Sequence, residues 1–255
     1  MITYKTKYEI DLMARAGRLL ASVLPPLKAA CEPGVRTLEL DRIADKLIRE
    51  GGAAPGFLGY NGFPKSICVS INDEAVHGIP GNRKIADGDL VSLDLGLILE
   101  GFWADVGITV GVGNVSAEGK RLIKVTEEAL YVGIAKAQPG GWLGDISNAI
   151  QEHVEKAGFS VIRQFVGHGI GRQMHEDPQV PNFGRPGTPP RLKAGMTLAI
   201  EPMVNAGSYE VFMKPDGWTI CTADGSLSAY FEHTVAVTES GPLVLTALPP
   251  AKASR

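Results

Sequence analysis

Four acidic residues lie inside otherwise apolar segments of the sequence, where an unpaired charge would be costly to bury. They are Asp94, Asp105, Glu201 and Glu232. In each segment the alternate positions are small or hydroxylated, and the intervening ones are mostly Leu, Ile and Val. This pattern indicates strands whose acidic face has room for a ligand. Any one of these acids could equally be a strand-end residue paired with Lys, but four converging carboxylates would repel one another unless protons or divalent cations relieve them.

Glycine-flanked histidines are candidates for a nitrogen ligand, because glycine neighbours allow a metal or substrate to approach the imidazole closely. His168 lies in the sequence GHGIG, His175 follows seven residues later, and His77 lies in VHGI. Each alone would more often be a structural residue. Four carboxylates and one neutral imidazole around two divalent ions and a bridging hydroxide would leave a net charge of about −1. Oxygen-rich ligation of this kind suits Mn²⁺, Fe²⁺ or Co²⁺.

The composition excludes several other classes of protein. The chain has 255 residues, of which 44% are hydrophobic and 21% charged, as expected for a folded soluble protein. No apolar run is long enough to span a bilayer, so we expect no membrane association. The net charge of −3, without a run of Lys or Arg, argues against general nucleic-acid binding. The three cysteines form no CxxC pair, which predicts reduced thiols and a cytoplasmic location.

The elements that must position these residues follow a recognisable order. In the first part, apolar spacing predicts a helix from residue 6 that ends near Pro25 and Pro26, and a second helix capped by Thr37 and closed by Gly51. Strands and a turn should follow, at residues 90–95, 100–101 and 105–112.

The same order recurs later in the chain. Helices are expected near residues 116–137 and 143–157, and strands at 197–204 and 229–237. The offset is nearly constant. Pro33 and Pro139 are 106 residues apart, and Asp94 and Glu201 are 107 residues apart. We therefore expect one catalytic domain, residues 1–255, made of two pseudo-symmetric halves at about 5–112 and 113–245 that share a sheet and enclose a cleft.

Several short motifs accompany the acids and histidines. They are FPKS at 63–66, SIN at 70–72, HGIP at 77–80, Asp94 with Asp105, GHGIG at 167–171, HE at 175–176, IEPM at 200–203 and FEHT at 231–234. Together they resemble the type I methionine aminopeptidases, the short bacterial form in the creatinase-like superfamily of metallopeptidases. The resemblance implies the α+β pita-bread fold, a curved antiparallel sheet covered by helices.

The resemblance also implies the activity and the metal ligands. The expected reaction is hydrolytic removal of the initiator methionine from nascent proteins and peptides with a small second residue. Asp94 would bind one metal, Asp105 and Glu232 would bridge both, and His168 and Glu201 would bind the other. The two divalent ions would be Fe²⁺, Mn²⁺ or Co²⁺, with Zn²⁺ as a further option.

Catalytic and substrate-binding roles follow from the same resemblance. Glu201 would act as the general base toward the metal-bridging water, His175 would contact the scissile peptide, and His77 would steady the tetrahedral intermediate and the departing amine. The methionine pocket would consist of Phe57, Tyr60, Phe63, Cys68, Met174 and Trp218. An unbranched thioether fits such an aromatic and sulfur-lined slot. Without the resemblance, these six residues would be interpreted as loop and core packing.

The chain departs from the family pattern beside one bridging acid. Trp103 and Val106 flank Asp105 where relatives often have His and Thr, and Asn61 replaces a histidine of the pocket loop. Loss of a neighbouring hydroxyl alters the hydrogen bonds that orient a ligand. His233 alternates away from Glu232 and is expected to be structural.

Two alternative functions share parts of this pattern. Xaa-Pro peptidases of the superfamily use the same five ligands but usually carry an added N-terminal domain, whereas the catalytic pattern here begins almost at Met1. A binding module that has lost its metals would not retain all five ligands. The preferred interpretation is a monomeric aminopeptidase that acts on nascent chains, with at most a transient ribosome contact.

Overall fold

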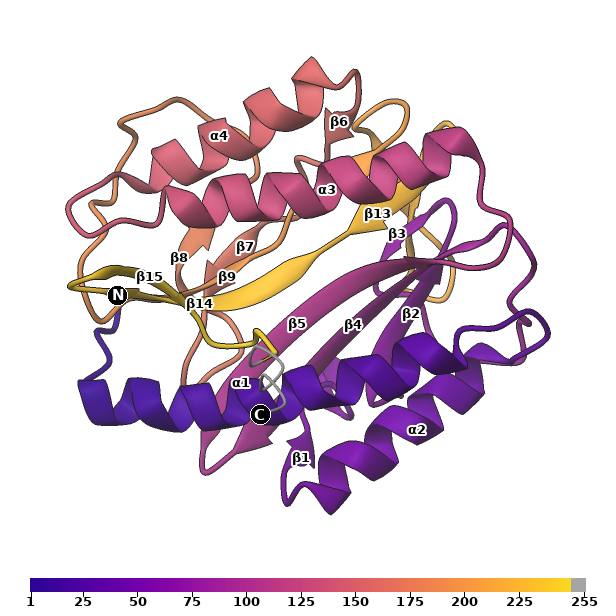
Figure 1. The fold of residues 1–255 in the computed structure, drawn as a ribbon, viewed down its shortest axis with the longest axis horizontal. Coiled ribbons are helices and arrows are strands. Elements are labelled where there is room, and N and C mark those ends of the chain that lie inside the picture. The colour runs from indigo at the N-terminus through magenta and orange to yellow at the C-terminus, as the bar shows by residue number, and fades with distance from the viewer. Residues whose placement is uncertain (249–255) are drawn as a thin grey trace, which may run out of the picture.

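The central feature of the computed structural model, which describes residues 1–248, is a curved antiparallel sheet of nine strands covered by helices (Figure 1). The main strand order is β1-β4-β5-β14-β9-β7-β8, with β15 paired to β14 and β2 paired to β4. The strands are β1 (Ala54–Pro55), β2 (Ile67–Ile71), β4 (Leu90–Leu99), β5 (Phe102–Gly111), β7 (Gly167–Gly169), β8 (Glu176–Val180), β9 (Thr197–Ile200), β14 (Glu232–Thr238) and β15 (Gly241–Val244).

Two smaller antiparallel sheets extend this one. The first has the order β13-β10-β6, with β13 at Ser228–Tyr230, β10 at Met203–Asn205 and β6 at Ser160–Val161. The second has the order β11-β12-β3, with β11 at Val211–Met213, β12 at Ile220–Thr222 and β3 at Glu74–Val76.

The helices pack in two pairs, one on each half of the large sheet (Figure 1). They are α1 (Lys7–Ala30), α2 (Thr37–Glu50), α3 (Ala117–Ala135) and α4 (Leu143–Lys156), and a short 3₁₀ helix, η1, covers Tyr60–Gly62. Helices α1 and α2 form one buried cluster with β2, β4 and β5, and α3 and α4 form another with β9 and β14. The α+β architecture, a curved antiparallel sheet covered by helices, agrees with the sequence prediction.

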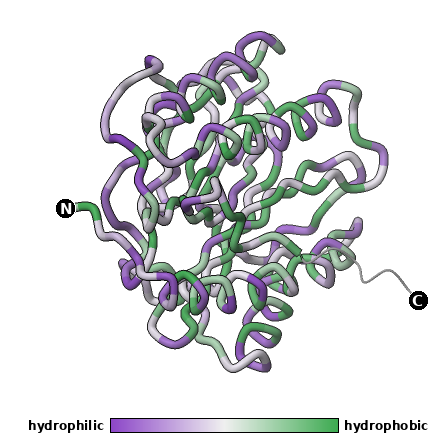
Figure 2. The backbone as a smooth tube through the Cα atoms, turned by 60° about the vertical axis from the view of Figure 1, so that its left-hand side comes forward, coloured by the Kyte–Doolittle hydropathy of each residue, from purple (hydrophilic) through white to green (hydrophobic). Residues whose placement is uncertain are grey.

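Side chains along β4 alternate between the two faces of the sheet, so one face contributes to the core and the other to the candidate site. Leu93, Leu95 and Leu97 are fully buried beneath the helices, so Asp94 and Gly96 point to the opposite face. Figure 2 shows the corresponding mixture of hydrophobic and hydrophilic residues along strands and helices. Strand β4 therefore buries its apolar face beneath the helices and keeps its polar face on the opposite side of the sheet.

The predicted turn between the two long strands is present. Glu100 and Gly101 connect β4 to β5 and both have positive φ, 52° and 78°. Two such residues form the tight turn whose twist matches that of a hairpin. The hairpin fixes the register that places Gly96 opposite Asp105.

The predicted helix end near Pro25 and Pro26 is wrong, because α1 continues through both prolines to Ala30. A proline inside a helix removes one backbone hydrogen bond. Here the loss is offset by packing, since Leu27 is fully buried in the core cluster of this half. Thr37 is also not the cap of α2 but its first residue, and its hydroxyl exchanges hydrogen bonds with the backbone of Gly81.

The strands predicted at 197–204 and 229–237 are each interrupted. Strand β9 ends at Ile200, Glu201 and Pro202 follow, and the chain resumes as β10 in the small sheet. Proline cannot donate to a strand ladder. The second strand breaks at Phe231, between β13 and β14. Both segments therefore cross between the large sheet and the β13-β10-β6 sheet. Glu201 and Glu232 lie at these two crossing points.

Candidate metal centre

The acidic residues are arranged in a row by the register of neighbouring strands. Asp94 of β4 lies opposite Gly107 of β5, and Gly107 lies opposite Glu232 of β14. Asp105 lies opposite Gly96 in the same hairpin. Acids therefore alternate with glycines across three strands, so space remains between the carboxylates.

Aromatic rings occupy the space above both glycines. A Cβ atom on Gly96 would lie 2.4 Å from Cε1 of Phe57, and one on Gly107 would lie 2.1 Å from Cε1 of Tyr230. Both distances are far below van der Waals contact. The small residues that the sequence shows on the acidic face thus accommodate side chains of the protein itself.

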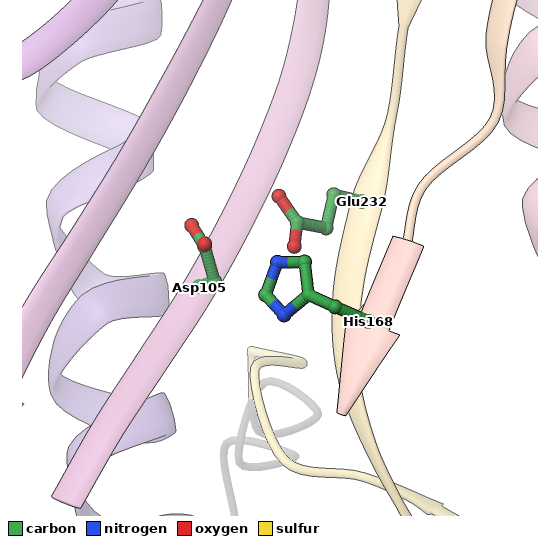
Figure 3. Close-up of side chains that lie close together, drawn as sticks. All are labelled: Asp105, His168 and Glu232. Carbon is green, nitrogen blue, oxygen red and sulfur yellow. The ribbon is translucent and has the colours of Figure 1, made fainter. Parts of the chain in front are cut away.

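Asp105, His168 and Glu232 form a compact cluster that could hold a metal ion (Figure 3). Each offers one ligand atom, and the three atoms lie within 4.8 Å of one another. All three residues are buried, and they come from β5, β7 and β14. A nitrogen and two carboxylate oxygens are a donor set suited to a first-row divalent cation.

Glu201 and Asp94 adjoin this cluster. Nε2 of His168 lies 3.5 Å from Oε1 of Glu201, and a cavity of about 90 Å³ is lined by Asp94, Asp105, His168 and Glu201 together. The structure therefore brings to one place all five residues that the sequence analysis proposed as ligands.

The hydrogen bond of His168 indicates which of its two ring nitrogens is available to bind a metal ion. Nδ1 lies 2.8 Å from the carbonyl oxygen of Gly169, which can only accept, so Nδ1 carries the proton. Burial lowers the pKa of His168 to about 4. The ring is consequently neutral near pH 7, and the lone pair of Nε2 faces Glu201, an orientation suited to metal binding.

Burial and mutual repulsion shift the carboxylates strongly. Burial raises the pKa of Asp94 to about 7. Burial, with repulsion from the neighbouring acids, raises the pKa of Asp105, Glu201 and Glu232 well above the usual range of carboxyl groups. Without a cation the site would therefore hold protons, as expected for like charges in a confined space.

Several buried carboxylate oxygens of the cluster have no hydrogen-bond partner in the described part of the chain, which bears on whether these residues suit a metal ion. Oδ1 of Asp94, Oδ1 of Asp105 and Oε1 of Glu232 are buried and have no hydrogen-bond partner among residues 1–248. Buried polar atoms are nearly always paired, so each such atom requires an explanation. Three carboxylate oxygens that share one small site fit divalent cations well.

The two further histidines lie at the mouth of this cavity. His77 and His175 both line it. Nδ1 of His175 is 2.7 Å from the hydroxyl of Tyr60, and the ring of His77 packs edge-on against Phe165 with centroids 5.6 Å apart. His77 has a φ of 59°, a left-handed conformation that non-glycine residues adopt uncommonly.

All six residues proposed for the methionine pocket surround a second cavity. Its volume is about 190 Å³, and Phe57, Tyr60, Phe63, Cys68, Met174 and Trp218 line it. Phe63 and Trp218 meet edge-on with centroids 5.0 Å apart. His77, Asp94 and His175 line both cavities. An aromatic and sulfur-containing pocket thus adjoins the acidic cluster directly.

The residues that depart from the family pattern also lie here. Trp103 packs edge-on against Tyr60, with ring centroids 5.6 Å apart, and Asn61 lines the second cavity. Val106 is fully buried on the opposite, apolar side of β5. A hydroxyl does reach Asp105, but from the neighbouring strand, because Thr234 bonds to its backbone N–H and C=O at 2.9 and 2.8 Å.

His233 has the structural role predicted for it. Its ring is hydrogen-bonded to Tyr131 and Thr246. A residue that the sequence analysis missed is Tyr230, whose hydroxyl donates a hydrogen bond to Oε2 of Glu232. Residues two positions apart in a strand point to the same face, so the spacing of Tyr230 and Glu232 is the feature of the sequence that could have identified Tyr230.

A wider groove opens from the same histidines. Its volume is about 750 Å³, and His168 and His175 lie in its wall. Polar side chains along the rest of the groove include Glu9, Gln173 and Gln179. The small acidic cavity therefore shares lining residues with both the aromatic pocket and a wider groove.

Comparisons with known proteins agree with this geometry. The profile of metallopeptidase family M24 matches residues 11–239. A methionine aminopeptidase of Clostridium perfringens is 56% identical over 246 residues, which cover 96% of this chain and 99% of the relative. Methionine aminopeptidase 1 of Bacillus subtilis is 53% identical over 246 residues, with the same coverage of both chains.

Solved structures show the same fold. The crystal structure of a methionine aminopeptidase from Thermotoga maritima superposes with a TM-score of 0.95 at 45% identity, and the match covers 96% of this chain and 99% of that one. A prolidase from Pyrococcus furiosus gives a TM-score of 0.77 at 23% identity over 96% of this chain and 66% of the prolidase. The second likeness shows the fold alone.

Proposed function

Because the chain belongs to metallopeptidase family M24, we propose that it is a methionine aminopeptidase, a hydrolase that removes the N-terminal methionine from nascent proteins and peptides with a small second residue. The observation that carries this proposal is the contact between the acidic cluster and the aromatic pocket. The relatives that match almost the full chain bear the same name. Divalent metal use follows from the family and the cluster.

The proposed centre holds two divalent ions, Fe²⁺, Mn²⁺ or Co²⁺, with Zn²⁺ as a further option. Asp94, Asp105, His168, Glu201 and Glu232 would hold them, and the unpartnered oxygens of Asp94, Asp105 and Glu232 support this assignment. When bound, the ions supply Lewis acidity that polarises the scissile carbonyl and lowers the pKa of a coordinated water.

Glu201 is the residue we propose as general base. About 13% of its side chain is exposed, and it lines the cavity with its carboxylate beside His168. A carboxylate at that position can accept a proton from the attacking water and later donate it to the leaving amine. Asp94 and the other acids also create a negative field, which favours the positively charged α-amine of a substrate and restricts cleavage to the first residue.

His175 and His77 would contact the scissile peptide, because they lie between the pocket for the first side chain and the acidic cavity. The second cavity would hold the methionine side chain, whose flexible thioether suits aromatic and sulfur contacts. Discrimination against a side chain shorter by one methylene should reach only about 1–3 kcal/mol. The wider groove beyond the histidines provides room for the remainder of the polypeptide.

The proposal also includes the setting of the reaction. Cys31, Cys68 and Cys221 are free, buried thiols, which supports a reducing compartment such as the cytoplasm. None of the helices among residues 1–248 is long and apolar enough to cross a membrane. We propose a monomer whose residues 1–255 act as one catalytic domain on nascent chains, with at most a transient ribosome contact.

A comparison of two peptides tests the proposed function. The dialysed protein is incubated with Met-Ala-Ser or Ala-Pro-Ser, with and without added Mn²⁺ or Co²⁺, and the free amino acid is measured. We expect metal-dependent release of methionine from the first peptide and no cleavage of the second. Release of alanine from Ala-Pro-Ser without release of methionine would overturn the assignment in favour of an Xaa-Pro peptidase.

A further inference from the structure

Tyr230 lies at the centre of the candidate site although no metal-binding or catalytic motif includes it. It ends β13, is only 3% exposed, and lines the same small cavity as Asp94, Asp105 and Glu201. A buried phenol normally hydrogen-bonds its hydroxyl to a specific partner. Here the partner is Oε2 of Glu232.

The backbone of Tyr230 is held firmly in place. Its N–H donates to the hydroxyl of Thr109 at 2.8 Å, and its C=O accepts from the same hydroxyl at 2.9 Å. Since the proton of Thr109 is used in this way, Ser92 donates to Thr109 at 2.8 Å. These bonds tie the end of β13 to β4 and β5, the strands that carry Asp94 and Asp105.

The ring of Tyr230 occupies the space above Gly107, where a larger residue would place its side chain. Gly107 is the register partner of both Asp94 and Glu232, and a Cβ on it would lie 2.1 Å from Cε1 of the ring. The glycine thus lets the phenol lie across the strand between two of the acids. The hydroxyl reaches Glu232 from this position.

The two oxygens of Glu232 are consequently different. Oε2 accepts the hydrogen bond from Tyr230, whereas Oε1 is buried without a partner among the described residues. We propose that Tyr230 is a positioning residue of the metal centre, whose hydroxyl fixes the rotation of the Glu232 carboxylate and so presents Oε1 to a divalent ion. This inference rests on the proposed function, because it requires that the acids bind metal.

Direct measurement of metal affinity tests this role. Mn²⁺ and Co²⁺ are titrated separately into chelator-treated protein by calorimetry, with Tyr230→Phe compared to the unsubstituted chain. The variant keeps the ring over Gly107 and removes only the hydroxyl. Because hydrogen bonds to ligands typically contribute 10- to 100-fold in metal affinity, we expect Kd to rise by about 10- to 100-fold.

Tyr131→Phe is the matched control. Among residues 1–248, its hydroxyl makes one hydrogen bond, 3.2 Å from Nε2 of His233, and the side chain is half exposed. We expect its Kd to equal that of the unsubstituted chain. Urea unfolding in chelator is measured for all three proteins. An unchanged Kd for Tyr230→Phe, with or without a loss of stability, would overturn the inference. Failure of the unsubstituted chain to bind either ion would instead overturn the proposed function.

Discussion

The carboxylate of Glu201 combines two proposed roles, metal ligand and proton acceptor. Glu201→Gln keeps the size and shape of the side chain but removes its charge and its basicity. We expect kcat for Met-Ala-Ser at saturating metal to fall by at least about 10²-fold, as is typical when a general base is lost. Circular dichroism should show an intact fold.

A matched substitution, Glu210→Gln, changes an exposed residue and should leave kcat unchanged. Metal content is determined for both variants, so that loss of an ion is distinguished from loss of the base. A rate near that of the unsubstituted protein in metal-loaded Glu201→Gln would exclude Glu201 as the base.

Most residues of the candidate site could be predicted from the sequence. Asp94, Asp105, Glu201 and Glu232 could be found because an acid in an apolar strand has few structural explanations. His168 and the pocket residues needed the family resemblance, since glycine-flanked histidines and scattered aromatics have no unique meaning. Tyr230 was missed because a strand tyrosine next to the site looks like any other core aromatic, and its hydrogen bond depends on the space above a glycine in another strand.

Gly107 of strand β5 affects the candidate site because it has no side chain and so leaves space for the ring of Tyr230. Gly107→Ala would place a Cβ 2.1 Å from the ring of Tyr230. The ring or the strand must then move, and such overpacking typically costs about 1–3 kcal/mol. We expect a lower free energy of unfolding in urea and, because the phenol is displaced, a weaker affinity for Mn²⁺.

The control for this prediction is Gly81→Ala, because the nearest atom to its new Cβ would be a carbonyl oxygen 3.9 Å away. That variant should unfold near the unsubstituted midpoint and bind Mn²⁺ normally. Equal urea midpoints for the two variants would show that the site tolerates a larger residue at 107.

Elements were predicted well where local pattern determines them and poorly where packing does. The helices, the β4–β5 hairpin and the recurring order follow from hydrophobic periodicity and turn residues. The extension of α1 through Pro25 and Pro26 could not be predicted, because it depends on the burial of Leu27 by distant segments. The breaks at Glu201–Pro202 and Phe231 reflect a change of partner strand, which the sequence alone does not specify.

The whole molecule should respond to pH through its cluster of buried acids. In the metal-free protein the pKa of Asp94 is about 7, and the pKa values of Asp105, Glu201 and Glu232 lie higher than in an unfolded chain. The native state therefore binds more protons than the unfolded state, and stability is lost as pH rises through the native pKa values. We expect the free energy of unfolding in chelator to decrease between pH 7 and pH 8.

Urea unfolding at the two pH values, in chelator and with saturating Mn²⁺, measures this effect. Metal ions replace the protons, so the decrease should disappear or reverse in Mn²⁺. The pKa values of His77 and His168, both about 4, lie below that of an unfolded histidine, so these residues add stability mainly as pH rises from about 4 to 7 and oppose the decrease only slightly between pH 7 and pH 8. A metal-free protein that is equally stable or more stable at pH 8 would contradict this account of the cluster.

We propose that five side chains from both halves of the molecule hold two divalent ions beside a methionine pocket. Anomalous diffraction from crystals grown with Mn²⁺ tests it most directly. Two manganese peaks are expected, both within bonding distance of atoms from Asp94, Asp105, His168, Glu201 and Glu232. Manganese bound elsewhere, with these five side chains left without an ion, would contradict it.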